Sequence, residues 1–207
     1  MSAAHTRLIL ARHGEVEPRY QRVFGGRIDM GLSDHGHEQA ARLADWLAGI
    51  EFAGVYVSPM KRARLTAAPL LARNGHDARF VEALREVDFG AWTGLTWEQV
   101  QERHQISAFD WLHALDRGDL PDAEPAGAFQ RRVAGAVDDI IASHPGGTSL
   151  VLCHGGVIRA ALAHLIRVPL PKTARFEIDY ASVSIVEIAP HRAKITLLNY
   201  TPWRSLP

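Results

Sequence analysis

The feature that most constrains the fold is an apolar run, Leu8 to Ala11, that stops abruptly at Arg12, His13 and Gly14. Such a run is typical of a buried strand. A cation and an imidazole directly after it lie where a parallel strand would end, and ligand crevices of open α/β sheets form at that edge. We therefore expect a buried strand that brings His13 to the edge of a sheet, beside a ligand.

The same arrangement recurs in the second half of the chain. The apolar run Thr148 to Cys153 is followed by His154 and Gly155, and then by a helical pattern over Val157 to Ile166. Glycine lets backbone N–H groups approach a ligand closely, and the start of a helix offers further donors and the positive end of its dipole. Two histidines in matched contexts predict one shared site.

A third segment adds a cation to this site. Gly54 to Val57 predicts a short strand, and Ser58 and Pro59 then predict a helix, with Ser58 as the capping residue and Pro59 in the first helical position. Arg62 would lie in the first turn, where the helix dipole disfavours a cation unless an anion lies between it and the helix end. Arg62 therefore indicates an anion site.

Two arginines, two histidines and a helix N-terminus favour a compact dianion, and phosphate is the natural candidate. A bound phosphoryl group beside an unprotonated imidazole is open to displacement, and water can later hydrolyse the covalent intermediate. The leaving oxygen then needs a proton. The acidic stretch offers Glu82, Glu86 and Asp88 as candidate general acids, and the residues alone leave that choice open.

Metal binding is the competing use of histidines. Neither His35 with His37 nor His13 with His154 has an obvious set of partnering carboxylates or thiolates, and Arg12 would repel a cation. We therefore expect no metal and no cofactor.

Length, charge and cysteine content set the broader expectations. The 207 residues predict a single domain, 1–207, with a helical cap at about 92–128. A formal net charge of zero provides no overall field to recruit nucleic acid or a membrane. The single cysteine, Cys153, excludes an intramolecular disulfide and fits a reducing compartment. Because Met1 to Thr6 lacks signal-peptide features and no apolar run approaches roughly 18 residues, we expect a cytoplasmic protein.

Taken together, these motifs resemble the histidine phosphatase superfamily, the phosphoglycerate mutase-like proteins. They follow one another in the family's order and span residues 8 to about 160. The blocks that carry the resemblance are Arg12-His13-Gly14-Glu15, Gly26 to Ser33, Ser58 to Ala67, Leu84 to Gly94, and Cys153-His154-Gly155-Gly156.

The resemblance implies an α/β fold: a three-layer sandwich with a central, mainly parallel sheet flanked by helices. It implies that His13 is the nucleophile that becomes phosphohistidine and that Glu86 is the proton donor. Arg12, Arg62 and His154 are implied to bind and neutralise the phosphoryl oxygens.

Further implied contacts concern the substrate. Gly25, Gly26 and Gly155 fall where the family brings backbone close to the substrate phosphate. Arg19 replaces an asparagine that commonly lies six residues after the nucleophile. Two interpretations stay open: Arg19 adds a substrate-binding cation, or its side chain points into solvent.

The sequence predicts a phosphomonoester hydrolase that acts on a small phosphorylated metabolite through phosphohistidine, without metal. The alternatives are a cofactor-dependent phosphoglycerate mutase and a module that binds a phosphorylated ligand without turnover. The short chain disfavours the mutase, and the intact set of catalytic residues disfavours the module. We expect neither a nucleic-acid nor a membrane partner, and a homodimer stays open because an exposed patch cannot be located without a fold.

Overall fold

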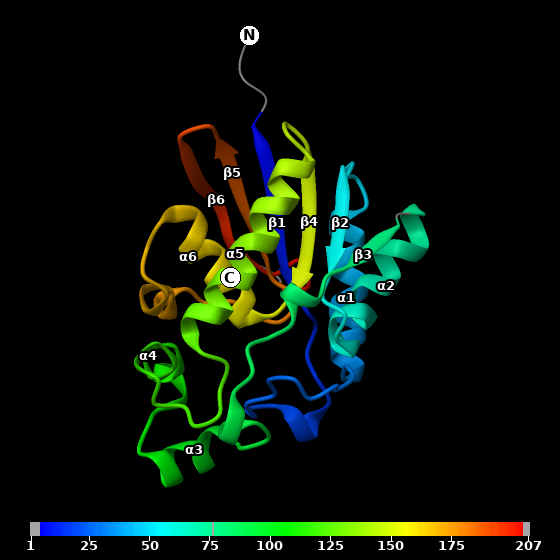
Figure 1. Cartoon of the computed structure of the whole chain (residues 1–207). Helices are drawn as coiled ribbons and strands as arrows, with labels where there is room; N and C mark the ends of the chain where they lie inside the picture. Colours follow the sequence, from blue (N-terminus) through cyan, green and yellow to red (C-terminus); the bar gives the residue numbers. More distant parts are fainter. Residues whose placement is uncertain (1–4, 76, 205–207) are drawn as a thin grey trace.

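A computed structural model describes residues 5–75 and 77–204, except the side chain of Asn74, and contains one six-stranded sheet (Figure 1). The strands lie in the order β3-β2-β4-β1-β5-β6. They are β1 (Thr6–Arg12), β2 (Gly54–Val57), β3 (Ala78–Phe80), β4 (Thr148–Cys153), β5 (Val183–Ala189) and β6 (Arg192–Tyr200). The α-helices are α1 (Asp34–Leu47), α2 (Lys61–Asn74), α3 (Trp97–His104), α4 (Trp111–Arg117), α5 (Ala126–Ser143) and α6 (Gly155–Ile166).

The sheet is mainly parallel, as predicted. Strands β1, β4, β2 and β3 run in the same direction, whereas β5 pairs antiparallel with β1, and β6 antiparallel with β5. Arg12 is paired with Cys153 in the β1–β4 register, and the N–H of His13 donates to the Cys153 carbonyl at 3.0 Å. His13 and His154 therefore leave the sheet from neighbouring positions at one edge.

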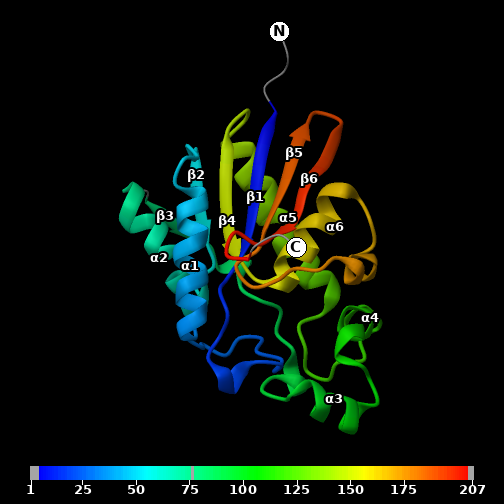
Figure 2. The ribbon, with the colours of Figure 1, turned by 180° about the vertical axis from the view of Figure 1, so that it is seen from behind.

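Alternate residues of β1 belong to two separate hydrophobic clusters. Leu8 and Leu10 pack in the cluster formed with α5 and α6, and Ile9 and Ala11 in the cluster formed with α1 and α2. The strand is thus buried on both faces, which explains its continuous apolar run. The two views of the ribbon show α5 and α6 on one side of the sheet and α1 on the other, which confirms the three-layer sandwich (Figure 2).

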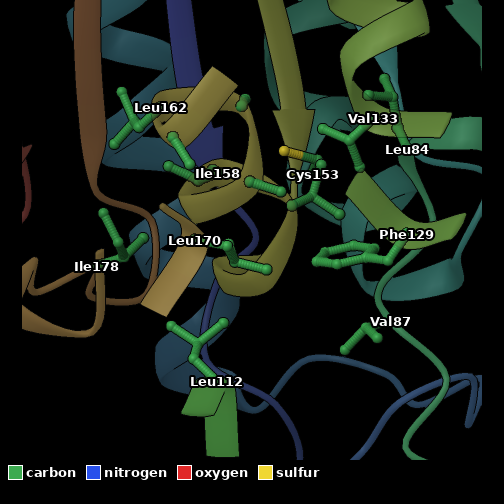
Figure 3. Close-up of a cluster of buried hydrophobic side chains, with 14 of the residues drawn as sticks. Leu84, Val87, Leu112, Phe129, Val133, Cys153, Ile158, Leu162, Leu170 and Ile178 are labelled. Atoms are coloured by element: carbon green, nitrogen blue, oxygen red, sulfur yellow. The ribbon is translucent and has the colours of Figure 1, made fainter. Parts of the chain in front are cut away.

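The cluster beneath α5 and α6 also contains Cys153. Figure 3 shows the side chains of Phe129 and Val133 from α5 on one side of Cys153, with Ile158 and Leu162 from α6 on the other. Burial raises the pKa of the Cys153 thiol far above its ordinary value. Cys153 is a core residue, as expected.

The start of α2 differs from the prediction. Met60 holds the N-cap position and the helix begins at Lys61, so Ser58 does not cap it. The Ser58 hydroxyl instead lies 2.7 Å from His154 Nε2. The N–H of Lys61 donates to Asp29 Oδ1 at 2.8 Å, so the capping acceptor comes from a distant loop. Arg62 still lies in the first turn, as predicted.

Helices α3 and α4 lie beyond the end of the sheet at which β1 and β4 end (Figure 1). Thr96 and Gln99 begin α3 with reciprocal side-chain to backbone hydrogen bonds, which is the capping box expected from their spacing. A single 3-10 turn, Ala108–Asp110, leads into α4. These elements bring side chains of the 92–128 segment toward the edge that carries His13.

Two expectations from the sequence concern a signal peptide and a membrane-spanning segment. Residues 1–4, which carry most of the expectation about a signal peptide, lie outside the described residues. Within 5–75 and 77–204, no helix is both long and apolar enough to cross a membrane.

Candidate active site

His13 is held in one tautomer by its two hydrogen-bond partners. Its Nδ1 lies 2.8 Å from the Gly14 carbonyl oxygen, which can only accept, so Nδ1 carries the proton. Its Nε2 accepts from Arg62 Nε at 3.2 Å, so Nε2 carries the lone pair. The imidazole therefore presents an unprotonated Nε2 toward the guanidinium.

His154 mirrors this arrangement. The same Arg62 Nε donates to His154 Nδ1 at 3.2 Å, and His154 Nε2 donates to Ser58 Oγ at 2.7 Å. The two imidazole rings are 5.2 Å apart between centroids. One guanidinium N–H thus lies between the two unprotonated ring nitrogens.

Both imidazoles are neutral at neutral pH. His13 is 5% exposed and His154 is fully buried. Burial lowers the pKa of each histidine well below its ordinary value, and the charge of Arg62 lowers both further. A neutral imidazole is the form that can attack phosphorus.

Arg62 is anchored by the loop that precedes α1. Its Nη1 donates to the Ile28 carbonyl at 2.8 Å, and its Nη2 donates to the Gly26 carbonyl at 3.0 Å. Gly26 has φ of +44°, in the region that favours glycine. Burial lowers the pKa of Arg62 to about 10, so the side chain stays a cation at neutral pH.

Arg12 brings a second cation to the same edge. Its Nη1 donates to the Ile178 carbonyl at 2.7 Å, and its guanidinium lies 4.0 Å over the ring of Tyr180. The Tyr180 ring is in turn 5.6 Å from that of His13. Tyr180 therefore fixes Arg12 beside the imidazole through a cation–π contact.

Of the three acidic residues left open by the sequence, all of which are described, Glu86 lines the pocket. Its Oε2 accepts from the N–H of Gly156 at 3.1 Å, and its Oε1 accepts from the N–H of Val87 at 3.0 Å. The carboxylate of Glu82 pairs with Arg85 outside the pocket. The side chain of Asp88 is bonded to the N–H of Gly90 at 3.0 Å and also lies outside it.

These groups surround a pocket of about 530 Å³. Seven of the nine residues expected from the sequence line it. They are Arg12, His13, Gly25, Gly26, Arg62, Glu86 and Gly155. His154 lies behind Arg62 rather than in the lining. Within 5–75 and 77–204, no group of three or more His, Cys, Asp or Glu side chains is arranged to hold a metal ion.

The family model of the histidine phosphatase superfamily (branch 1) matches residues 8–201. The chain belongs to this superfamily. The match covers the two strands, both histidines, both arginines and Glu86, which confirms the resemblance stated from the sequence.

The relatives of this histidine phosphatase are named for different substrates. Phosphoserine phosphatase 1 of Hydrogenobacter thermophilus is 30% identical over 195 residues, 94% of this chain and 92% of its own. The adenosylcobalamin/alpha-ribazole phosphatase of Escherichia coli is 28% identical, over 93% of this chain and 95% of its own. The solved mycobacterial glucosyl-3-phosphoglycerate phosphatase superposes with a TM-score of 0.82 at 25% identity, over 95% of this chain and 99% of its own.

Arg19 of this histidine phosphatase lies outside the pocket lining, next to Tyr20, which belongs to it. Its side chain is 70% exposed, lies 3.4 Å from the Glu17 carboxylate, and stacks on Tyr20 at 4.8 Å. It is not among the described residues that line the pocket. This placement favours the solvent-facing interpretation, because Glu17 already partners the guanidinium.

Two residues in the site were missed from the sequence. Arg159 lies four residues after Gly155 on α6, and its Nη2 donates to the Phe176 carbonyl at 2.9 Å. Burial lowers the pKa of Arg159 to about 10, so this side chain stays a cation at neutral pH and lines the pocket with Arg12 and Arg62. The four-residue helical spacing was a usable signal for Arg159. Tyr180 had none, because it lies in an irregular segment before β5.

Proposed function

We propose that this protein hydrolyses phosphomonoesters of small metabolites through a phosphohistidine intermediate on His13, without a metal ion. The observation that carries the proposal is the fixed tautomer of His13. Its Nδ1–H is held by the Gly14 carbonyl, and its Nε2 lone pair accepts from Arg62 Nε at the wall of a pocket that Arg12 also lines; an incoming phosphoryl group takes the place of that hydrogen bond. A buried, neutral and oriented imidazole beside two cations is suited to attack a phosphoryl dianion.

In the first step, His13 Nε2 attacks phosphorus and the bond from phosphorus to the alcohol oxygen breaks. Protonated Glu86 gives its proton to that oxygen, so the alcohol leaves neutral. Arg12 and Arg62 balance the charge on the equatorial phosphoryl oxygens. His154 is a positioning residue in this proposal, because it contacts Arg62 Nε from behind the lining.

In the second step, Glu86 accepts a proton from water as the water oxygen attacks phosphorus. The Nε2–phosphorus bond breaks, and inorganic phosphate leaves. His13 is then neutral again and Glu86 is protonated again, so the cycle closes without a co-reactant. The anchored guanidinium groups serve both steps.

The test is to trap the intermediate. Mixing with an aryl phosphate in the presence of a chelator, followed by quenching in alkali, should give one phosphoryl group per chain on His13, located by mass spectrometry. His13→Ala should remove both turnover and the adduct. His164→Ala is the matched control, since His164 is paired with Asp138 away from this pocket and should behave as wild type. Retained activity in His13→Ala would refute the mechanism.

The same assay separates hydrolysis from the mutase alternative. With 3-phosphoglycerate and catalytic 2,3-bisphosphoglycerate, a hydrolase should release phosphate and form no 2-phosphoglycerate. The proposal also covers location, partners and domain organisation. The enzyme acts in the cytoplasm on a small molecule and binds no nucleic acid. Residues 1–207 form a single domain, and the 92–128 segment caps the pocket. Light scattering tests the homodimer left open above.

A further inference from the structure

The pocket has a second end that phosphoryl transfer does not use. His13 lies beside Arg12 and Arg62, whereas aromatic side chains supplied by the cap and the segment before it form another part of the lining, where Arg22 lies 5.3 Å over the ring of Trp97. The rings that matter here are Phe89, Trp97, Phe109 and Trp111. Three of them, Trp97, Phe109 and Trp111, come from the segment that runs from α3 to α4, which no part of the proposed mechanism requires.

The rings are held by one another. Phe89 meets Trp111 edge to face, with centroids 5.1 Å apart and planes at 75°. Trp97 meets Phe109 in the same way, at 5.5 Å and 65°. Edge-to-face pairs at these distances fix ring orientation. The aromatic wall that these rings form therefore has a defined shape before any ligand binds.

Phe109 is unusual for its exposure. It is 75% exposed, on the 3-10 turn Ala108–Asp110, although it lines the pocket. A phenyl ring left in water at the mouth of a pocket, continuous with further rings inside it, is typical of a surface that a ligand covers.

The aromatic wall meets the reacting groups at Trp111. A Cβ built on Gly156 would lie 3.1 Å from Trp111 Cη2 and would overlap Glu86 Oε1, so the indole edge and the carboxylate flank the same small space. Because Glu86 must reach the leaving oxygen, the carbon atoms attached to that oxygen lie against Trp111. The rest of the alcohol then extends toward Trp97 and Phe109.

We propose that the substrate is a phosphomonoester whose alcohol carries an aromatic ring, which stacks on the wall formed by Trp97, Phe109 and Trp111. This inference rests on the proposed hydrolysis, since it assigns the leaving group of that reaction. The charged alternative is an alcohol bearing a carboxylate, held by Arg159. The buried Nε of Arg159 has no hydrogen-bond partner among the described residues, and Arg175 also lines the pocket, so the comparison with O-phosphoserine below decides between this alternative and the aromatic alcohol.

The test compares substrates with similarly poor alkoxide leaving groups. We expect kcat/KM for 2-phenylethyl phosphate to exceed those for ethyl phosphate and O-phosphoserine by about 10-fold or more, the range that burial of a ring supplies. Phe109→Ala should lower the ratio of 2-phenylethyl to ethyl phosphate by about 3- to 10-fold. Phe80→Ala is the matched control, because Phe80 is 54% exposed on β3, outside the pocket lining, and its loss should leave the ratio unchanged.

The outcomes separate the two proposals. Equal kcat/KM for the two alkyl phosphates, a preference for O-phosphoserine, or an unchanged ratio in Phe109→Ala would overturn the aromatic subsite. Each of these results would leave the phosphohistidine mechanism standing. If no phosphomonoester were turned over and no adduct formed on His13, the hydrolysis itself would fail, and the leaving-group assignment with it.

Discussion

The N–H of Gly156 donates a 3.1 Å hydrogen bond to Glu86 Oε2, while Glu86 Oε1 occupies the space that a Cβ on Gly156 would need. The first turn of α6 and the proposed proton donor are therefore fitted to each other at the backbone. Leu84 and Val87, which flank Glu86 in the chain, are both fully buried in the cluster of Figure 3 and anchor the segment that carries it.

Gly156→Ala should displace the Glu86 carboxylate without removing it. We expect kcat for alkyl phosphates to fall about 10- to 100-fold, because misplacing a reacting group costs roughly that much. 4-Nitrophenyl phosphate, whose leaving group needs no proton, should be slowed less in single-turnover measurements. Gly135→Ala is the control, since a Cβ there meets open space on the exposed side of α5 and should leave both rates unchanged.

Glu86→Gln keeps the shape of the side chain and removes its exchangeable proton. Phosphorylation of His13 by alkyl phosphates should slow by about 10²- to 10⁴-fold, the usual contribution of general acid catalysis. The loss with 4-nitrophenyl phosphate should be smaller in the same burst experiment. Equal losses across a series of leaving groups would count against Glu86 as the acid.

The two buried imidazoles should make folding stability fall in mild acid. Their pKa values are lowered in the folded state, so below pH about 6.5 the unfolded chain binds protons that the folded chain does not. The free energy of unfolding should therefore decrease as pH falls from 7.5 to 5, by up to about 1.4 kcal/mol per pH unit for each histidine. Urea denaturation across this range measures the slope. His13→Gln should reduce it by about half, and an unchanged slope would contradict the assignment.

Arg132 should act as a positioning residue for the Glu86 segment. Its guanidinium donates to the carbonyls of Ala83 at 2.6 Å, Arg85 at 2.8 Å and Glu86 at 3.2 Å, and forms a largely buried pair with Glu124.

Arg132→Lys cannot reproduce this planar set of donors. It should lower the free energy of unfolding by about 1–3 kcal/mol, and it should reduce kcat for alkyl phosphates more than for aryl phosphates. Arg131→Lys, at an exposed neighbouring position, is the control for denaturation and kinetics. If the two variants lost stability alike, Arg132 would have no special role.

The parts of the site that lie next to regular elements were predictable from the sequence. The strand ends predict His13 and His154 as site residues, because a buried apolar run followed by a histidine and a glycine is a local sequence pattern. Glu86 could not be chosen by local chemistry, since Glu82 and Asp88 have the same side-chain type nearby. The family resemblance selected it.

Other parts depend on contacts between distant segments. Ser58 matched a capping signal, but its hydroxyl is bonded to His154, and Asp29 caps α2 instead. Tyr180 contacts Arg12 only because β5 returns beside β1. The spacing of residues within one segment does not encode contacts between distant segments. Local sequence patterns therefore predict the wrong role for Ser58 and predict nothing for Tyr180.

The register that pairs Arg12 with Cys153 has a consequence for how the enzyme can be studied. His13 and His154 come from opposite halves of the chain, and a one-residue slip between β1 and β4 would turn one imidazole to the other face of the sheet. Helices can form early from local contacts, whereas this pairing needs a long loop to close. The recovery of turnover during refolding therefore measures when the central sheet closes. Circular dichroism of the helices does not report that step.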